Sequence, residues 1–354
     1  MKIVVGKDII RAEWEALVKA SATGTWFQTP EAYEFFAGQA ESFRPFAIAV
    51  ANGANGENGD ATLNGGALRG VCVGYVTVEK SAMKQFLTRR AIIIGGPALA
   101  DDATDEEVEA LLNAVRKELK SKAIYVETRN FNDYSKWRSA FEAAGFEYVP
   151  HLNFHVDTSS IEIVDSNIGK SRKRDIKTTI REGVSIVSIG DSRLEIGDLE
   201  VERMVHEYYL TLKNLYETKV KTPLFPESFF QALAKHPDGR ILLTMKNGKV
   251  IGGTVCVAQE GKCLYEWFVC GRDGEWKAIF PSCYATYAGI RYAAEHNMPR
   301  FDMMGAGTPK EAYGVRDFKA RFGGKEVEHG RFLCIIKPLL YKIGVFGVKI
   351  LKRR

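Results

Sequence analysis

Phe301-Asp302-Met303-Met304-Gly305 and the nearby run Tyr313-Gly314-Val315-Arg316-Asp317-Phe318-Lys319-Ala320-Arg321-Phe322-Gly323-Gly324 indicate the architecture most directly. They predict a strand ending in Asp and Gly, a loop and a short helix. Val315, Phe318 and Phe322 follow i, i+3, i+7 spacing, so we expect them on one helical face turned toward a core. Lys319 follows a buried position, so its stem should lie along apolar surface while its ammonium reaches a cleft. Its removal should then barely change the thermal midpoint.

This segment resembles the end of the catalytic domain in Fem-type (FemABX) peptidoglycan aminoacyltransferases. That family carries Gly-Leu-x-x-Phe-Lys-x-x-Phe, and here the pattern reads Gly314-Val315-Arg316-Asp317-Phe318-Lys319-Ala320-Arg321-Phe322. The resemblance implies a catalytic Lys319 and makes Phe318, Tyr313 and Arg316 candidate substrate-binding residues. Spacing alone favours a solvated helix lysine instead, because lysines are mostly exposed.

Length and composition indicate a soluble protein of two domains. A chain of 354 residues with 45% hydrophobic and 26% charged residues is typical of globular proteins. The N-terminus lacks the apolar run of a signal peptide and no run suits a membrane span, so we expect a cytoplasmic protein. Six cysteines form no C-x-x-C pair, and we expect them to be reduced and structural, with no metal site (Cys72, Cys256, Cys263, Cys270, Cys283, Cys334).

Charge is divided unevenly between the halves. Residues 1–155 carry a net charge of −3, whereas the remaining 199 residues carry +8. The second half is therefore the better candidate for binding a polyanion, although the signal is modest.

The order of expected elements is similar in the two halves. In the first we expect helices over 10–20, after Thr29-Pro30, after the capping box that begins at Thr104 and over 134–144, with strands over 46–50, 70–79, 123–128 and 146–149. Residues 51–66 are rich in Gly and Asn and are expected to form a mobile hairpin excursion. In the second half we expect helices over 166–182, 199–217, 226–235 and 281–296, with strands over 184–188, 240–245, 250–258, 262–269 and 300–303.

This order favours an α+β (mixed α/β) fold with two tandem GNAT-like (acyl-CoA N-acyltransferase-like) domains. The strand, helix, Gly-Phe, strand order near residue 145 is how such domains finish, and a duplicated GNAT fold is what the Fem-type family has. We expect an N-terminal domain over 1–155, a catalytic domain over 156–336 and a basic apolar tail over 337–354.

Basic residues crowd the expected helix after Gly169. Arg174, Lys177 and Arg181 are spaced to share a face that could bind RNA or diphosphate oxygens, and Fem-type enzymes carry a similar helix. A solvated basic face is the equal alternative.

The loop after the third meander strand argues against coenzyme A. GNAT enzymes hold the pyrophosphate there on Gly-rich backbone and a helix N-terminus. Here the loop reads Cys270-Gly271-Arg272-Asp273-Gly274-Glu275-Trp276-Lys277-Ala278-Ile279-Phe280-Pro281-Ser282, with different glycine spacing and two bulky side chains. We therefore expect no cofactor, although Arg272 remains a candidate contact for a phosphate.

No nucleophilic triad is readable, and aminoacyl transfer need not use one. The tRNA ester is already activated, so the acceptor amine needs positioning, desolvation and a stabilised oxyanion. Lys319 suits the oxyanion or the departing ribose oxygen. Asp302 is the candidate proton acceptor, and capping of the following loop is its more common role.

Two further features concern the substrates. The first half keeps Trp26-Phe27-Gln28-Thr29, from which Trp26 and Gln28 are candidate substrate-binding residues, but no nearby lysine can serve as a diphosphate ligand. The tail 338–354 is apolar with a basic end, so it either lies at the inner membrane surface or packs on its domain.

The sequence therefore predicts an enzyme that moves an amino acid from aminoacyl-tRNA to an amine of a UDP-linked or lipid-linked peptidoglycan precursor. One alternative is an N-acyltransferase that acts on another envelope glycan or lipid-linked substrate with an acyl-thioester donor. The other is a non-catalytic binding domain of the same fold. The absence of sustained heptads, which would form a coiled-coil arm, is a departure from many Fem-type enzymes.

Overall fold

The computed structural model describes residues 1–52, 67–79, 88–190, 197–310 and 314–352, with only the backbone for 346–352. The hairpin excursion expected over 51–66 falls almost wholly outside these residues, as does Tyr313. The chain divides into two compact units, which we call unit 1 (residues 1–150 and 329–354) and unit 2 (residues 151–328).

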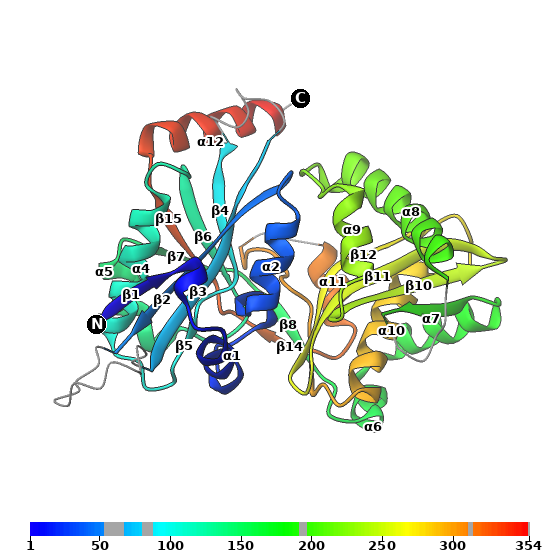
Figure 1. Cartoon of the computed structure of the whole chain (residues 1–354). Helices are drawn as coiled ribbons and strands as arrows, with labels where there is room; N and C mark the ends of the chain where they lie inside the picture. The colour runs from blue at the N-terminus through cyan, green and yellow to red at the C-terminus, as the bar shows by residue number, and fades with distance from the viewer. Residues whose placement is uncertain (53–66, 80–87, 191–196, 311–313, 353–354) are drawn as a thin grey trace. The chain divides into compact units, whose positions relative to one another are not determined.

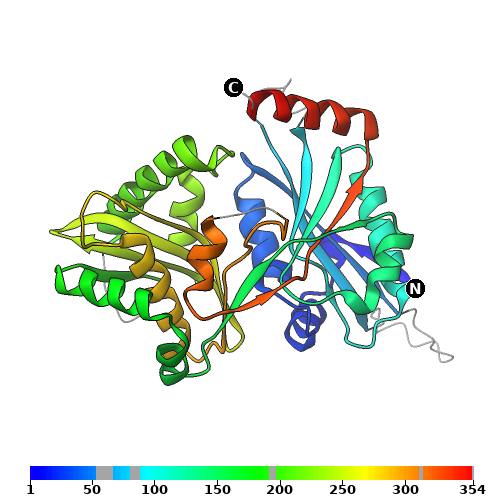
Figure 2. The same ribbon diagram turned by 180° about the vertical axis from the view of Figure 1, so that it is seen from behind.

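Unit 1 is a mixed sheet between two layers of helices (Figures 1 and 2). The strand order is β1-β2-β3-β4-β6-β15-β7, and β5 pairs with β3. The strands are β1 Lys2–Val5, β2 Phe43–Ala51, β3 Leu68–Thr77, β4 Arg90–Gly95, β5 Ala98–Leu99, β6 Tyr125–Asn130, β7 Glu147–Val149 and β15 Arg331–Ile335. The helices include α1 Arg11–Ala20, α2 Pro30–Gly38, α4 Asp105–Leu119, α5 Arg138–Ala143 and α12 Pro338–Lys352.

The apolar stripe of α4 explains one of these layers. Thr104 and Glu107 form the predicted capping box, which fixes where α4 begins. Val108, Leu111 and Val115 are fully buried and pack with α5 on one face of the sheet. Trp14 and Val18 of α1 form the core on the other face.

Unit 2 has the sheet order β14-β8-β13-β12-β11-β10-β9. Its strands are β8 Asn153–Asp157, β9 Ser185–Ile189, β10 Gly239–Lys246, β11 Lys249–Gln259, β12 Cys263–Gly271, β13 Arg300–Asp302 and β14 Lys325–Val327. Its helices are α6 Ile161–Asn167, α7 Lys170–Arg181, α8 Asp198–Leu215, α9 Glu227–Ala234, α10 Pro281–Glu295 and α11 Gly314–Ala320. The predicted α+β class is confirmed, and Asn247-Gly248 forms the turn between β10 and β11.

Several expected boundaries differ from the structure. The helix expected over 166–182 is two helices, because Gly169 adopts an extended conformation and caps the start of α7. The boundary expected at 155/156 cuts β8, which belongs to the sheet of unit 2. Residues 331–335, expected in the second domain, form β15, which pairs with β6 and β7 in unit 1.

The two sheets differ where their parallel strands meet. In unit 1, β4 and β6 pair over six positions, from Arg90↔Tyr125 to Gly95↔Asn130. In unit 2, β12 and β13 pair over three positions only and the last pair is Tyr265↔Asp302, although β12 continues to Gly271. Among the described residues, the edge of β12 beyond Tyr265 therefore has no strand partner on this side.

Gln28 lies in the core of unit 1, where β3 and β4 separate. Its Nε2 donates to the carbonyls of Val73 (3.0 Å) and Ile94 (2.9 Å), and its Oε1 accepts from the Val73 amide (2.7 Å). Trp26 is also buried, with its ring 5.3 Å from that of Phe27. The assignment of Gln28 and Trp26 to substrate binding is corrected here, because both side chains are enclosed by the unit that they hold together.

Replacement of Gln28 by Leu should lower the free energy of unfolding by about 2–3 kcal/mol. The substitution leaves the Val73 amide and two carbonyls without their partner inside a dry core. Urea unfolding of the two proteins measures the difference. A loss of less than about 0.5 kcal/mol would show that these backbone groups find other partners.

Candidate functional site

The loop after β13, residues 303–308, is held by side chains from several elements of unit 2. Lys319 on α11 is only 8% exposed, and its ammonium donates to the carbonyls of Met303 and Gly305, the latter at 2.8 Å. Arg316 on the same helix donates through Nε to the Ala306 carbonyl (3.2 Å) and through Nη2 to the Thr308 carbonyl. Both residues were predicted in the site, and both contact the loop.

Asp302 holds the same loop from the other side. Its Oδ1 accepts from Asn153 Nδ2 (2.7 Å) and from the Met304 amide (2.8 Å), while His155 Nε2 lies 3.1 Å from Oδ2. Burial opposes ionisation of this carboxyl, but His155, Arg300 and Asn153 lower its pKa below the ordinary value. Asp302 is therefore built to stay ionised and cap the loop, which is the alternative that the sequence left open.

The backbone of the loop is strained where these groups meet. Met304 has φ +52°, a left-handed conformation that side chains rarely adopt, and Gly305 has φ +114°. The Gly305 amide donates to Asn153 Oδ1 at 2.7 Å. Such a conformation persists only where neighbouring groups fix it. The loop begins directly after Asp302, which forms the last pair between β13 and β12.

Two expectations for α11 need correction. The Lys319 ammonium is buried against carbonyls, so it is not a flexible tip that reaches solvent. Val315 is 41% exposed, whereas Phe318 and Phe322 pack in the core of unit 2. The two rings lie 5.2 Å apart.

Arg172, which the sequence analysis did not assign to the site, joins α7 to this helix. Its guanidinium carbon lies 4.4 Å from the ring centre of Phe318 and 5.1 Å from that of Phe322. Its Nη2 also donates to the Phe318 carbonyl at 3.4 Å. Phe318 is therefore half-buried under a cation.

Glu266 is the acidic group that sequence reasoning missed. It is 3% exposed on β12, one residue beyond the last pair with β13. Its Oε1 accepts from Thr286 Oγ1 (2.8 Å) and Thr254 Oγ1 (3.2 Å), while Oε2 has no hydrogen-bond partner in the described part of the chain. An ionisable residue within Cys263-Leu264-Tyr265-Glu266-Trp267-Phe268 was the available signal, because an apolar strand rarely buries a carboxyl without a function.

Glu266 and Lys319 influence each other's charge. Burial raises the pKa of Glu266, and the nearby Lys319 opposes that rise. Burial likewise lowers the pKa of Lys319, against the effect of Glu266 and Asp302. A raised carboxyl pKa and a lowered ammonium pKa both move toward pH 7. Groups whose pKa values lie near the working pH are the most effective in proton transfer.

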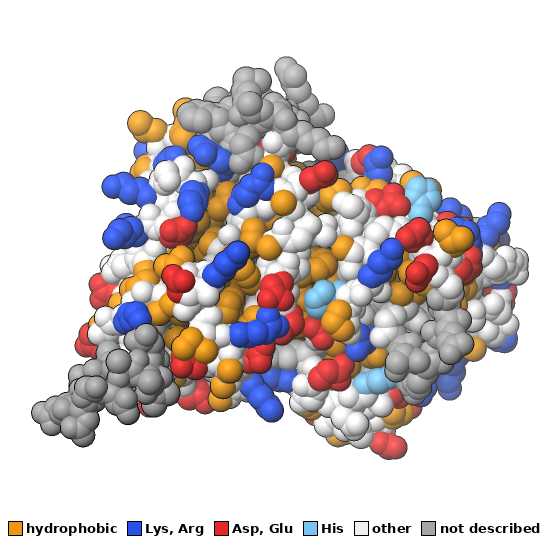
Figure 3. Space-filling view, viewed as in Figure 1, with side chains coloured by type: hydrophobic (Ala, Val, Ile, Leu, Met, Phe, Trp, Pro, Cys, Tyr) orange, Lys and Arg blue, Asp and Glu red, His pale blue; other side chains and the backbone are white. Residues whose placement is uncertain are grey.

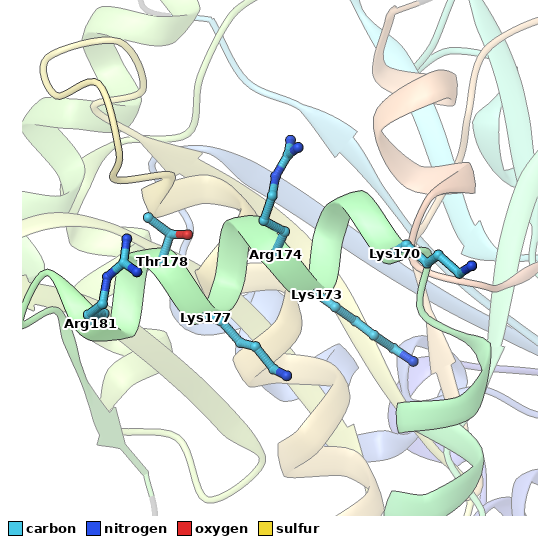
Figure 4. A pocket seen from close by; sticks show the side chains of 6 residues that line it. All are labelled: Lys170, Lys173, Arg174, Lys177, Thr178 and Arg181. Carbon is cyan, nitrogen blue, oxygen red and sulfur yellow. The ribbon is translucent and has the colours of Figure 1, made fainter.

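The basic residues of α7 lie on the surface of unit 2. Lys170, Arg174, Lys177 and Arg181 are exposed and, with Lys173 and Thr178, line a shallow hollow. Figure 4 shows Lys177 beside Lys173 and Arg174 pointing to another side, and the predicted group Arg174, Lys177 and Arg181 lines this one hollow. Within the described part of the chain, no carboxylate pairs with Lys173, Lys177 or Arg181, so their charges remain available.

The loop between β12 and α10 places a carboxylate at the N-terminus of α10. The Ser282 amide at the N-terminus of α10 donates to Asp273 Oδ1 at 3.3 Å, so a carboxylate stands where an anion would bind. Arg272 is exposed, with Nη1 3.7 Å from Glu275 Oε2. Acidic side chains at this helix terminus oppose binding of a second anion.

The cysteines supply no nucleophile. All six are free and buried, as predicted, and burial raises the pKa of Cys283 to about 12. In the described residues no cluster of His, Cys, Asp and Glu suits a metal ion.

Comparisons with known proteins support the architecture. Residues 170–319 match the family model "Acetyltransferase (GNAT) domain". The structure of FemX is similar over 97% of this chain and 99% of its own, with TM-score 0.67 and 14% identity. L-PGS from Bacillus licheniformis covers 99% of both chains (TM-score 0.53, 12% identity), and a tandem GNAT protein from the clavulanic acid biosynthesis pathway covers 95% of this chain and 98% of its own (TM-score 0.55, 10% identity).

These likenesses confirm the tandem GNAT-like, Fem-type fold. The segment that matches the GNAT acetyltransferase domain lies in unit 2 and runs from the start of α7 to Lys319. No curated protein matches the sequence of this chain.

Replacement of Lys319 by Met should lower the free energy of unfolding by about 2 kcal/mol. Met fills the volume but leaves the Met303 and Gly305 carbonyls unpaired. Lys325→Met, at an exposed position of β14, is the matched control and should stay within about 0.5 kcal/mol of the original protein. Equal stability of the two variants would show that the bonds from Lys319 to the two carbonyls do not stabilise the fold.

Replacement of Glu266 by Gln should change how stability depends on pH. Because the pKa of Glu266 is raised in the folded state, folding is favoured at pH values below the unfolded pKa of about 4.3, and this contribution is lost as pH rises through the folded pKa. The stability of the original protein relative to Glu266→Gln should therefore fall with rising pH. Urea unfolding of both proteins across a pH series measures the difference, and a constant difference would contradict the raised pKa.

Proposed function

We propose that the protein is an aminoacyltransferase that moves an amino acid from aminoacyl-tRNA to an amine of a UDP-linked or lipid-linked peptidoglycan precursor. The observation that carries the proposal is the buried Glu266 at the edge where β12 leaves β13, where the charge of Lys319 acts on its carboxyl. The acceptor assignment rests on the resemblance of Gly314–Phe322 to Fem-type enzymes.

Beyond Tyr265, no described strand continues the pairing of β12 with β13, and we place the acyl donor along this edge. Unit 1 offers no such edge between β4 and β6, since six pairs close it. We therefore assign the reaction to unit 2.

The proposed reaction is attack of the acceptor amine on the carbonyl carbon of the aminoacyl ester. A C–N bond forms, the C–O bond to the ribose breaks, the amine loses one proton and the ribose oxygen gains one. We assign proton acceptance to Glu266, whose Oε2 has no partner among the described residues. Lys319 supplies fixed positive charge near the oxyanion, and Asp302 and Arg316 position the 303–308 loop.

The donor is assigned to tRNA because unit 2 presents the α7 cations and the β12–α10 loop opposes a pyrophosphate. Coenzyme A is accordingly not proposed as a cofactor. An N-acyltransferase that uses another thioester donor remains the second candidate, which the match to the acetyltransferase domain favours.

The reaction is tested by incubating the protein with a mixture of charged tRNAs and peptidoglycan precursors and measuring the precursor mass. We expect a gain of one amino-acid residue, and a loss of about 100-fold in rate for Glu266→Gln at pH 7. Gain of an acyl mass from acyl-thioesters alone would establish the second candidate. Binding of precursor without turnover by any donor would establish a non-catalytic binding domain.

Replacement of Arg174, Lys177 and Arg181 by Gln should weaken tRNA binding and reduce its salt dependence. Three lost phosphate contacts lower the slope of log K against log salt by about 2 to 3. Exposed Lys213, Lys249 and Lys325 of unit 2, changed together to Gln, are the matched control. If log K depends on log salt with the same slope in both triple variants, the basic residues of α7 do not contact tRNA phosphates.

A further inference from the structure

α12 presents an apolar face that unit 1 does not cover. Leu339 is 79% exposed, Ile343 56% and Val345 38%, and Ile335, which ends β15 just before the helix, is 38% exposed. Scattered exposed apolar residues are ordinary, but four within eleven consecutive positions form a patch. We call Ile335, Leu339, Lys342, Ile343 and Val345 the α12 face.

The opposite side of α12 is fixed to unit 1. The amides of Ile336 and Lys337 both donate to the Ile124 carbonyl, at 2.9 and 2.8 Å. The Tyr341 ring lies 5.4 Å from that of Tyr125, the first residue of β6. The helix therefore lies across the end of the sheet (Figures 1 and 2) with a defined inner and outer side. Because the helix is anchored, its outer residues are exposed in the folded protein.

The charge that α12 itself contributes to its face is positive. The sequence of α12, Pro338–Lys352, contains no Asp or Glu. Lys342 is exposed on the helix, and Lys120 and Lys122 are exposed in the segment that leads to Ile124. The Lys122 ammonium bonds to Glu118, so Lys342 and Lys120 are the better candidates for outside anions. Figure 3 shows hydrophobic side chains where α12 begins, with Lys and Arg side chains nearby.

The position of Lys342 distinguishes a lipid surface from a protein partner. At 100° per residue, Lys342 lies between Leu339 and Val345 around the helix, inside the apolar face. The core of a protein interface is depleted of such charges. At a bilayer surface, the stem of a lysine lies among apolar groups while its ammonium meets phosphate. No helix in the described residues is long and apolar enough to cross a membrane, so the contact would be on one surface only.

We propose that the α12 face binds the surface of a bilayer containing anionic phospholipids, with Leu339, Ile343 and Val345 entering the interface and Lys342 meeting the headgroups. This proposal does not depend on the reaction assigned to unit 2. It gives the apolar C-terminal segment a structural role that the acyltransferase fold does not require.

Flotation of the full chain with lipid vesicles tests the proposal. The protein should bind vesicles of phosphatidylcholine mixed with phosphatidylglycerol, bind phosphatidylcholine alone much more weakly, and dissociate as NaCl is raised. Leu339→Ser/Ile343→Ser should weaken binding to the mixed vesicles by about tenfold or more, and Lys342→Glu by about tenfold. The thermal midpoint should stay unchanged in both variants because these side chains are exposed.

Leu199→Ser/Leu210→Ser is the matched control, since both leucines are exposed on α8 of unit 2 (84% and 51%). It should bind vesicles as the original protein does. The proposal is overturned if the original protein binds neither vesicle, or if Leu339→Ser/Ile343→Ser binds as well as the control. It is also overturned if sedimentation shows a dimer that Leu339→Ser/Ile343→Ser dissociates while vesicle binding is absent, because a second copy then covers the face.

Discussion

The contact of the Lys319 ammonium with the Met303 and Gly305 carbonyls is the constraint on which the arrangement of unit 2 depends. It brings α11 onto the loop that ends β13, and Asp302 and Asn153 fix the same loop from β13 and β8. A charged group removed from water requires partners, and these carbonyls provide them. The strained Met304 conformation is retained because these bonds hold the backbone on both sides.

The two units use one architecture in different ways. In unit 1 the parallel strands pair fully, and Gln28 bridges β3 and β4 from within the core. In unit 2 the corresponding strands part after three pairs, and ionisable groups gather at that point. A closed sheet gains backbone hydrogen bonds and stability, whereas an open edge leaves groups available to a ligand.

The sequence predicted most helices and strands correctly because their patterns are local. The capping box at Thr104 and the Asn247-Gly248 turn depend only on neighbouring residues. Short strands such as β14 and β15 were missed, because three to five residues carry little periodicity and their partners lie far away in the chain. Lys319, Asp302 and Arg316 were recognised as important, but a motif does not say whether a side chain points to solvent or to carbonyls. Gln28 and Trp26 were placed at a ligand because burial by distant strands is invisible in a short motif.

The return of β15 to the first sheet affects the order in which the chain can fold during synthesis. Unit 2 is inserted between two segments of unit 1, so all of residues 151–328 emerge before the strand that lies between β6 and β7. Domains usually fold from the N-terminus onward. Here the inserted unit can complete its sheet first. Until β15 is synthesised, β6 and β7 lack the strand that pairs with both of them. An unpaired strand edge invites pairing with another chain, so the interval before β15 arrives is when a nascent chain is most open to misassembly.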